Sequence, residues 1–237
     1  MKHTAALLLI FVLFACSKKE ADQTLHLSGT VKGLKKGTLY IRKIKDSSLV
    51  SIDTIRIDGS SDFTSDLHIE SPEMYYLFLD RGASNTLDNN LPFFAEAGNL
   101  RIETTLDHFL SDAKITGSKN HAKYEEFKKV TTRYNDQNLA LTEMKFHAFK
   151  DKNFKKVDSI SSLQNANMSR RYLYTTNFAL TNRDYEVAPY VTLSEISNIN
   201  LKYLDTIRKS MAPKVAKSLY GMKLIRFYDE RIKSEKK

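Results

Sequence analysis

The chain has 237 residues, of which 41% are hydrophobic, with a formal net charge of +9 and a single cysteine, Cys16. This length is enough for a domain with an apolar core of its own. A single cysteine excludes an internal disulfide and a Cys-x-x-Cys redox pair. The fold must therefore be stabilised by ordinary hydrophobic packing.

The first residues have the three-part pattern of a secretory signal. Lys2 supplies a positive charge, Ala5 to Leu13 are uninterrupted apolar residues, and the small residue Ala15 follows. As a helix, residues 5–15 would measure about 16 Å, which is too short for a bilayer core of about 30 Å. We therefore predict that residues 1–15 form a signal peptide rather than a permanent transmembrane helix.

The segment Leu13-Phe14-Ala15-Cys16 resembles the lipobox of bacterial lipoproteins. The resemblance implies cleavage before Cys16 and lipidation of Cys16, with the membrane as its partner. Residues 16–24 are charged and poor in apolar side chains, as in a flexible tether. Ser17 differs from the aspartate associated with inner-membrane retention, which favours a place in the cell envelope at the outer membrane. The face of that membrane stays open.

Residues 25–118 show the alternation and turn signals of short β-strands. Asp58-Gly59 is a strong turn signal, and Gly98 predicts a hairpin between 91–95 and 100–105. The predicted fold class is α+β, with an antiparallel β-sandwich or partly closed barrel at the N-terminus. The expected strands are 25–31, 38–44, 49–57, 63–69, 74–79, 91–95, 100–105 and 113–116.

Residues 119–237 have a helical period and form a helical region packed on or beside the β-domain. Pro189 fits a first helical turn, a short helix is expected around 201–208, and Pro213 is expected to open the last helix. The side chains expected to face inward are Tyr124, Phe127, Val130, Tyr134, Phe154, Val157, Ile160, Leu163, Val215, Leu219, Met222, Ile225 and Phe227.

Charge divides at the same boundary. Residues 16–118 carry a net charge of −3, with 12 Lys and Arg against 15 Asp and Glu; residues 119–237 carry +11, with 24 against 13. Such a basic half favours anionic lipid, an acidic glycan or an acidic envelope protein; the bland alternative is a solvated surface. The envelope location excludes nucleic acid. The candidate contact residues are Lys128, Lys129, Lys155, Lys156, Arg170 and Arg171.

No motif for a metal, a cofactor or a catalytic nucleophile is present. Asp107, His108 and Asp112 form the densest polar cluster, which is typical of a solvated turn. Three Asp-Ser/Thr-aliphatic tripeptides resemble the O-glycosylation sequon of Bacteroidetes envelope proteins. Their acceptors, and hence the candidate glycosylation sites, are Thr54, Ser159 and Thr206.

A further pattern is formed by short segments in a fixed order: 27–33, 37–41, 53–54, 58–59, 63, 94–102, 115–120, 187–190 and 218–221. Together these segments resemble a family of domains of unknown function. These domains stand N-terminal to thioredoxin-like, peroxiredoxin-type domains in Bacteroidetes lipoproteins, and the likeness extends over residues 25–232. The family often has Asn-Pro-x-Ser where this chain has Asn182-Arg183-Asp184-Tyr185. The sequence also stops at Lys237, where members of the family continue into the thioredoxin-like domain. The resemblance therefore implies a fold and a compartment, and no catalytic residue.

Three functions remain open from the sequence. The preferred one is an envelope-anchored, non-catalytic binding or scaffold module with an unknown ligand. The second is an accessory to thiol-redox chemistry that acts with a separate thioredoxin-like protein. The third is an unrecognised hydrolase whose site is assembled from distant residues. Fold alone does not choose among them.

Overall fold

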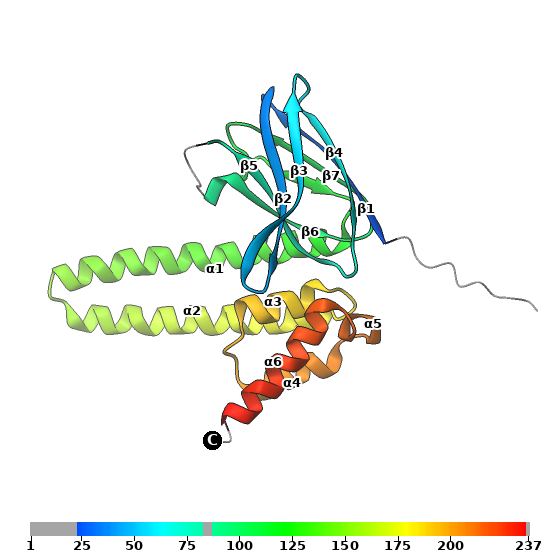
Figure 1. Cartoon of the computed structure of the whole chain (residues 1–237). Helices are drawn as coiled ribbons and strands as arrows, with labels where there is room; N and C mark the ends of the chain where they lie inside the picture. Colours follow the sequence, from blue (N-terminus) through cyan, green and yellow to red (C-terminus); the bar gives the residue numbers. More distant parts are fainter. Residues whose placement is uncertain (1–22, 83–86, 236–237) are drawn as a thin grey trace, which may run out of the picture.

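The structure is a computed structural model that describes residues 23–82 and 87–235. Cys16 and the predicted signal peptide lie outside the described residues. Within them, an N-terminal half of two four-stranded sheets is followed by a C-terminal half of helices, which confirms the predicted α+β class (Figure 1). No helix in the described part of the chain is both long and apolar enough to cross a membrane.

The first sheet has the strand order β4-β1-β7-β8. Its strands are β1 (Thr24–Lys32), β4 (Asp62–His68), β7 (Gly98–Thr105) and β8 (Lys114–Thr116). β1 runs antiparallel to β4 but parallel to β7, so this sheet is mixed rather than purely antiparallel. Gly29 is required in β1, because a Cβ there would lie 2.3 Å from the carbonyl oxygen of Ile102 and 2.4 Å from the Phe63 ring.

The second sheet is antiparallel, with the order β3-β2-β5-β6. Its strands are β2 (Lys36–Lys45), β3 (Ser48–Asp58), β5 (Glu73–Asp80) and β6 (Asn90–Ala95), with a short 3₁₀ turn η1 (Leu87–Asn89) before β6. The alternating strands place one apolar face of each sheet inward. The resulting core contains Leu25, Leu27, Leu100 and Ile102 from the first sheet and Leu39, Ile41, Leu77, Leu79, Leu91 and Phe93 from the second.

The predicted hairpin between 91–95 and 100–105 is wrong. β6 pairs with β5, where Phe94 lies opposite Met74, whereas β7 pairs with β1, where Leu100 lies opposite Leu27. The turn at Gly98 (φ +119°) carries the chain from one sheet to the other. A local turn signal does not reveal which sheet receives the next strand.

The helical half begins two residues after β8. Its helices are α1 (Lys119–Lys150), α2 (Phe154–Thr181), α3 (Val187–Glu195), α4 (Leu201–Ser210), α5 (Pro213–Ala216) and α6 (Leu219–Glu235). Ser118 caps α1, since its hydroxyl oxygen accepts a hydrogen bond from the backbone N–H of His121 at 2.9 Å. α1 and α2 form a long antiparallel hairpin, and α3 to α6 gather beside its near end (Figure 1).

Three side chains predicted to face inward are exposed instead. Phe154 and Leu163 of α2 are 60% and 55% exposed, because this part of α2 contacts little besides α1. Met222 is 53% exposed, because the helix begun at Pro213 ends at Ala216 and α6 starts afresh at Leu219. The interruption changes the helical phase, so that Gly221 and Leu224 face inward.

Candidate functional site

The near half of the α1–α2 hairpin is fixed to the outer face of the second sheet. Phe127 of α1 and Phe178 of α2, whose ring centroids lie 5.0 Å apart, form one buried cluster with Met74 of β5 and Phe94 of β6. Burial of such rings is among the largest apolar contributions to a core. The two helices are therefore held firmly where they cross the sheet.

The far half of the hairpin has a different environment. Its buried cluster contains Leu141, Ala148 and Ile160, with Val157 partly buried, and all four belong to α1 or α2. No residue of the β-domain takes part in it. Beyond about Tyr134 the hairpin therefore projects as an arm that is stabilised by its own two helices (Figure 1). We call residues 139–166 the arm.

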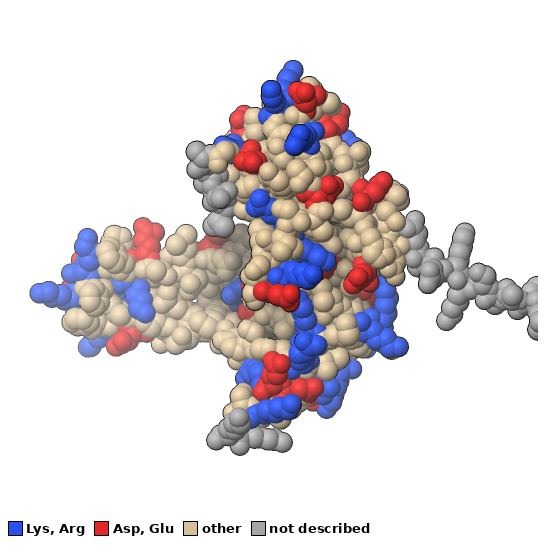
Figure 2. All heavy atoms as spheres, viewed as in Figure 1, with Lys and Arg blue, Asp and Glu red and all other residues tan. Residues whose placement is uncertain are grey.

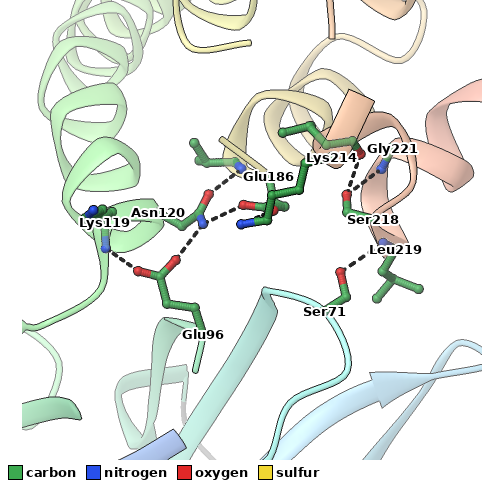
Figure 3. A network of polar contacts seen from close by, with 11 residues as sticks. Ser71, Glu96, Lys119, Asn120, Glu186, Lys214, Ser218, Leu219 and Gly221 are labelled. Carbon is green, nitrogen blue, oxygen red and sulfur yellow. Dashed lines mark hydrogen bonds and ion pairs between the residues drawn. The ribbon is translucent and has the colours of Figure 1, made fainter. Parts of the chain in front are cut away.

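A buried polar network joins the sheet, α1 and α3 at the base of the hairpin (Figure 3). The side-chain amide of Asn120 donates to Glu96 Oε2 at 2.6 Å and to Glu186 Oε2 at 2.8 Å. Its carbonyl oxygen accepts from the backbone N–H of Val187 at 2.9 Å, so α3 is capped by a residue of α1. Asn120 thus uses both donor hydrogens and its oxygen.

Glu186 is the least solvated carboxylate of this network, with 3% of its surface exposed. Its Oε1 has no hydrogen-bond partner among the described residues, but the ammonium of Lys214 lies 3.8 Å away. A buried carboxylate that lost Asn120 would keep only this one distant cation. The network is therefore a point at which a single substitution should be costly.

A second set of polar contacts holds α6 against β5 (Figure 3 shows part of it). The hydroxyl of Ser71 accepts from the backbone N–H of Leu219 at 3.0 Å, and the hydroxyl oxygen of Tyr220 accepts from Met74 N–H at 3.0 Å. Ser218 accepts from Gly221 N–H at 3.3 Å. The bonds of Leu219 and Gly221 satisfy donors at the start of α6, and the bonds of Ser71 and Tyr220 fix this start to the sheet.

A pocket of about 310 Å³ lies beside this junction, next to a second one of about 400 Å³. Glu186, Lys214 and Lys217 line the smaller pocket, and Glu70 and Ser71 line both. The lining charges are of both signs and largely offset one another. The pockets show no nucleophile paired with a base in the arrangement that covalent catalysis requires.

The strongest shifts move the pKa values of their groups further from 7. The hydrogen bond from His121 lowers the pKa of Glu125 to about 2, with a further contribution from Lys128 against the opposing effect of burial. Burial raises the pKa of Tyr124 to about 12 and also raises that of Tyr190. Each group therefore keeps one protonation state near pH 7, unlike a general acid or base tuned to that pH.

The six predicted basic contact residues do not form one patch. Lys128 pairs with Glu125 at 2.9 Å, and Arg171 pairs with Glu195. Lys155 and Lys156 lie at the far end of the arm, about 30 Å along the hairpin from Lys128 by helical rise. Among the described residues no ion pair engages Lys129, Lys155, Lys156 or Arg170, all four of which are exposed.

The predicted glycan acceptors lie on three separate elements. Thr54 is exposed on β3. Ser159 and Thr206 are exposed on helices, where their hydroxyls donate to the carbonyls of Lys155 and Lys202 at 3.0 and 2.9 Å. All three acceptors are accessible, and their modification stays a prediction.

The acidic cluster after β7 has a structural role. The hydroxyl of Thr105 donates to Asp112 at 2.8 Å and accepts from the backbone N–H of His108 at 3.1 Å, which ties the turn together. Within residues 23–82 and 87–235, no group of three or more His, Cys, Asp or Glu is placed to hold a metal ion.

Sequence reasoning missed the exposed aromatic residues of the arm. Phe146, Phe149 and Phe154 are 59%, 62% and 60% exposed near the turn between α1 and α2. A phenylalanine in a helical pattern is ordinarily assigned to the core. The available signal was the lysine-rich turn around them, at residues 150–156.

The chain thus has a β-domain of two sheets, and the polar network at its edge holds the base of the α1–α2 hairpin. The model of one protein family, described as a domain of unknown function (DUF4369), matches residues 25–124 of the chain. The match covers the strands and the first turns of α1 and leaves the arm outside. No curated protein and no solved structure matches the chain.

Proposed function

We propose that this chain is an envelope lipoprotein, anchored through Cys16, that acts as a non-catalytic binding or scaffold module. The β-domain serves as the support, and the arm is the element that binds. The observation that carries the proposal is the free-standing arm, which has exposed apolar and basic side chains and a buried cluster made by its two helices alone.

An arm of this kind exposes apolar surface to water, which is unfavourable unless a partner covers that surface. It leaves Leu139 71% exposed and Phe149 62% exposed, although soluble proteins ordinarily keep clustered apolar surface small. The buried junction fixes the direction of the arm, because Asn120 bonds to the sheet side and to α3 at once. A rigid base with an exposed end suits presentation to a partner.

The thiol-redox accessory remains the alternative to a simple scaffold. It rests on the resemblance to lipoprotein domains that precede thioredoxin-like domains. Under that alternative the partner of the arm, or of the β-domain, is a separate thioredoxin-like protein.

We expect a variant without the arm to lose its partner while it keeps its fold. Residues 139–166 would be replaced by a short Gly-Ser loop, which retains the hydrogen bond from Asn167 to the Tyr134 carbonyl at 2.8 Å. Crosslinked pulldown from intact cells would compare this variant with the parent chain. Both forms should keep Cys16 and be recovered from membranes in equal amounts.

The matched control changes the exposed end of the β2–β3 hairpin, where the paired residues Ile44 of β2 and Leu49 of β3 are replaced by serine. This control should retain every crosslinked product of the parent chain. If the arm-deleted variant retains them too, and also binds lipid vesicles as well as the parent chain does, the arm is not the binding element and the proposal is wrong. Recovery of a thioredoxin-like protein with the parent would favour the redox accessory.

A further inference from the structure

The end of the arm combines three exposed aromatic rings in a small space. Phe146 and Phe149 stand on the last turns of α1, and Phe154 begins α2. The rings of Phe149 and Phe154 meet edge to face, with centroids 6.3 Å apart, yet each residue stays about 60% exposed. Because Phe149 and Phe154 touch and Phe146 lies one helical turn before Phe149, the three side chains form a patch instead of scattered apolar residues.

Lysines surround these rings. Residues 143–158 contain five lysines and three acidic residues, Glu143, Asp151 and Asp158, a net charge of +2. The ammonium of Lys150 lies 5.2 Å from the Phe146 ring centroid, and no ion pair among the described residues engages Lys150, Lys152, Lys155 or Lys156. Figure 2 shows Lys and Arg atoms gathered at the end of the projecting hairpin.

We propose that the end of the arm binds the surface of an anionic lipid bilayer, with Phe146, Phe149 and Phe154 entering the boundary between headgroups and acyl chains. The lysines contact lipid phosphates from the rim of the patch. This inference rests on the proposed function of the arm and names its partner. Aromatic rings beside lysines are the combination that holds helices at membrane interfaces.

Charge selects this partner over a second copy of the chain. Two arm ends that met through their rings would bring two clusters of five lysines, each with a net charge of +2, together, and the repulsion would oppose the contact. An anionic bilayer offers negative charge and an apolar layer beneath it. A bilayer is also deformable, so it can fit around the end of the arm, from which the rings point outward.

The direction of the arm gives the bound geometry. Figure 1 shows the start of β1 and the end of the arm on opposite sides of the molecule. When the lipid on Cys16 and the end of the arm enter the same bilayer, the hairpin lies along its surface.

The chain contains no tryptophan, so one introduced tryptophan reports on its own position. We would place it by Phe149→Trp in the chain from Ser17 onward, which keeps every described residue. With vesicles that contain phosphatidylglycerol, its fluorescence should shift to shorter wavelength and be quenched by brominated acyl chains. The matched control, Ile52→Trp on β3, where the native side chain is 41% exposed, should show neither change.

Vesicle cosedimentation supplies the affinities. Two variants should bind at least about tenfold more weakly than the parent chain. The first replaces Phe146, Phe149 and Phe154 with serine. The second replaces four lysines with glutamine: Lys150, Lys152, Lys155 and Lys156. Binding should also be lost near 1 M salt, where the screening length is about 3 Å. Serine at Ile44 and Leu49 should change nothing. Circular dichroism should be identical throughout, because the replaced side chains are largely exposed.

Equal binding to phosphatidylcholine vesicles and anionic vesicles would overturn the inference, and so would an unshifted tryptophan. If the arm instead yields a protein product in the intact-cell pulldown, its partner is a protein. The inference then fails while the proposed function stands. If neither vesicles nor cells give an arm-dependent product, both fail.

Discussion

Cys16→Ala should move nearly all of the protein from the membrane pellet to the soluble fraction. The acyl chains on a lipidated cysteine contribute about 0.8 kcal/mol per buried CH₂ group, and several chains together give durable anchoring. Alanine has no thiol to accept them. Because Cys16 is the only cysteine, no other residue can replace it in a thioether linkage.

Fractionation after a high-salt wash measures this effect. The wash removes peripheral attraction, which is screened within about 3 Å at 1 M salt, and leaves the lipid anchor intact. Ser17→Ala is the matched control and should remain acylated and membrane-bound. If the Cys16→Ala protein is recovered in the pellet with acyl chains attached, the lipoprotein assignment fails.

Asn120→Ala should lower the free energy of unfolding by about 3 kcal/mol, because it leaves a buried carboxylate without its hydrogen bond. Asn120 is 2% exposed and connects Glu96, Glu186 and the N-terminus of α3. Alanine removes all three bonds and leaves Glu186 with Lys214 at 3.8 Å. Few other substitutions of a polar side chain here should cost as much.

Urea unfolding compares this variant with Asn138→Ala, which changes an exposed asparagine on the same helix and should cost less than about 0.5 kcal/mol. Glu186→Gln should cost less than Asn120→Ala, since it removes the buried charge and can still accept from Asn120. If Asn120→Ala and Asn138→Ala unfold alike, the junction does not stabilise the base of the hairpin.

The sequence predicts elements well where the signal is local. Alternation, β-forming residues, apolar runs and turn signals located β1 to β5, and the helical period located α4 closely. The parallel pairing of β1 with β7 was not predictable in this way, because it joins Leu27 to Leu100 across most of the β-domain. Nothing in the residues around Gly98 distinguishes a hairpin from a change of sheet.

For the candidate site too, the sequence predicted the features that depend on local composition and missed those that depend on distant residues. Composition located the basic half and its lysines. It did not place Asn120 beside Glu186, because they are 66 residues apart in the chain. It also assigned Phe154 to the core, because an amphipathic period does not state how many neighbours a helix has. In the arm each helix has one neighbour, so apolar side chains remain exposed.

The central claim, that the arm is the binding element, is tested most directly by photocrosslinking in intact cells. A benzophenone amino acid would replace Phe149 on the arm or, in a separate strain, Ile52 on β3, where the native side chains are 62% and 41% exposed. We expect a crosslinked product at position 149, to lipid or to a protein, and none at position 52. A product at position 52 with none at position 149 would contradict this claim.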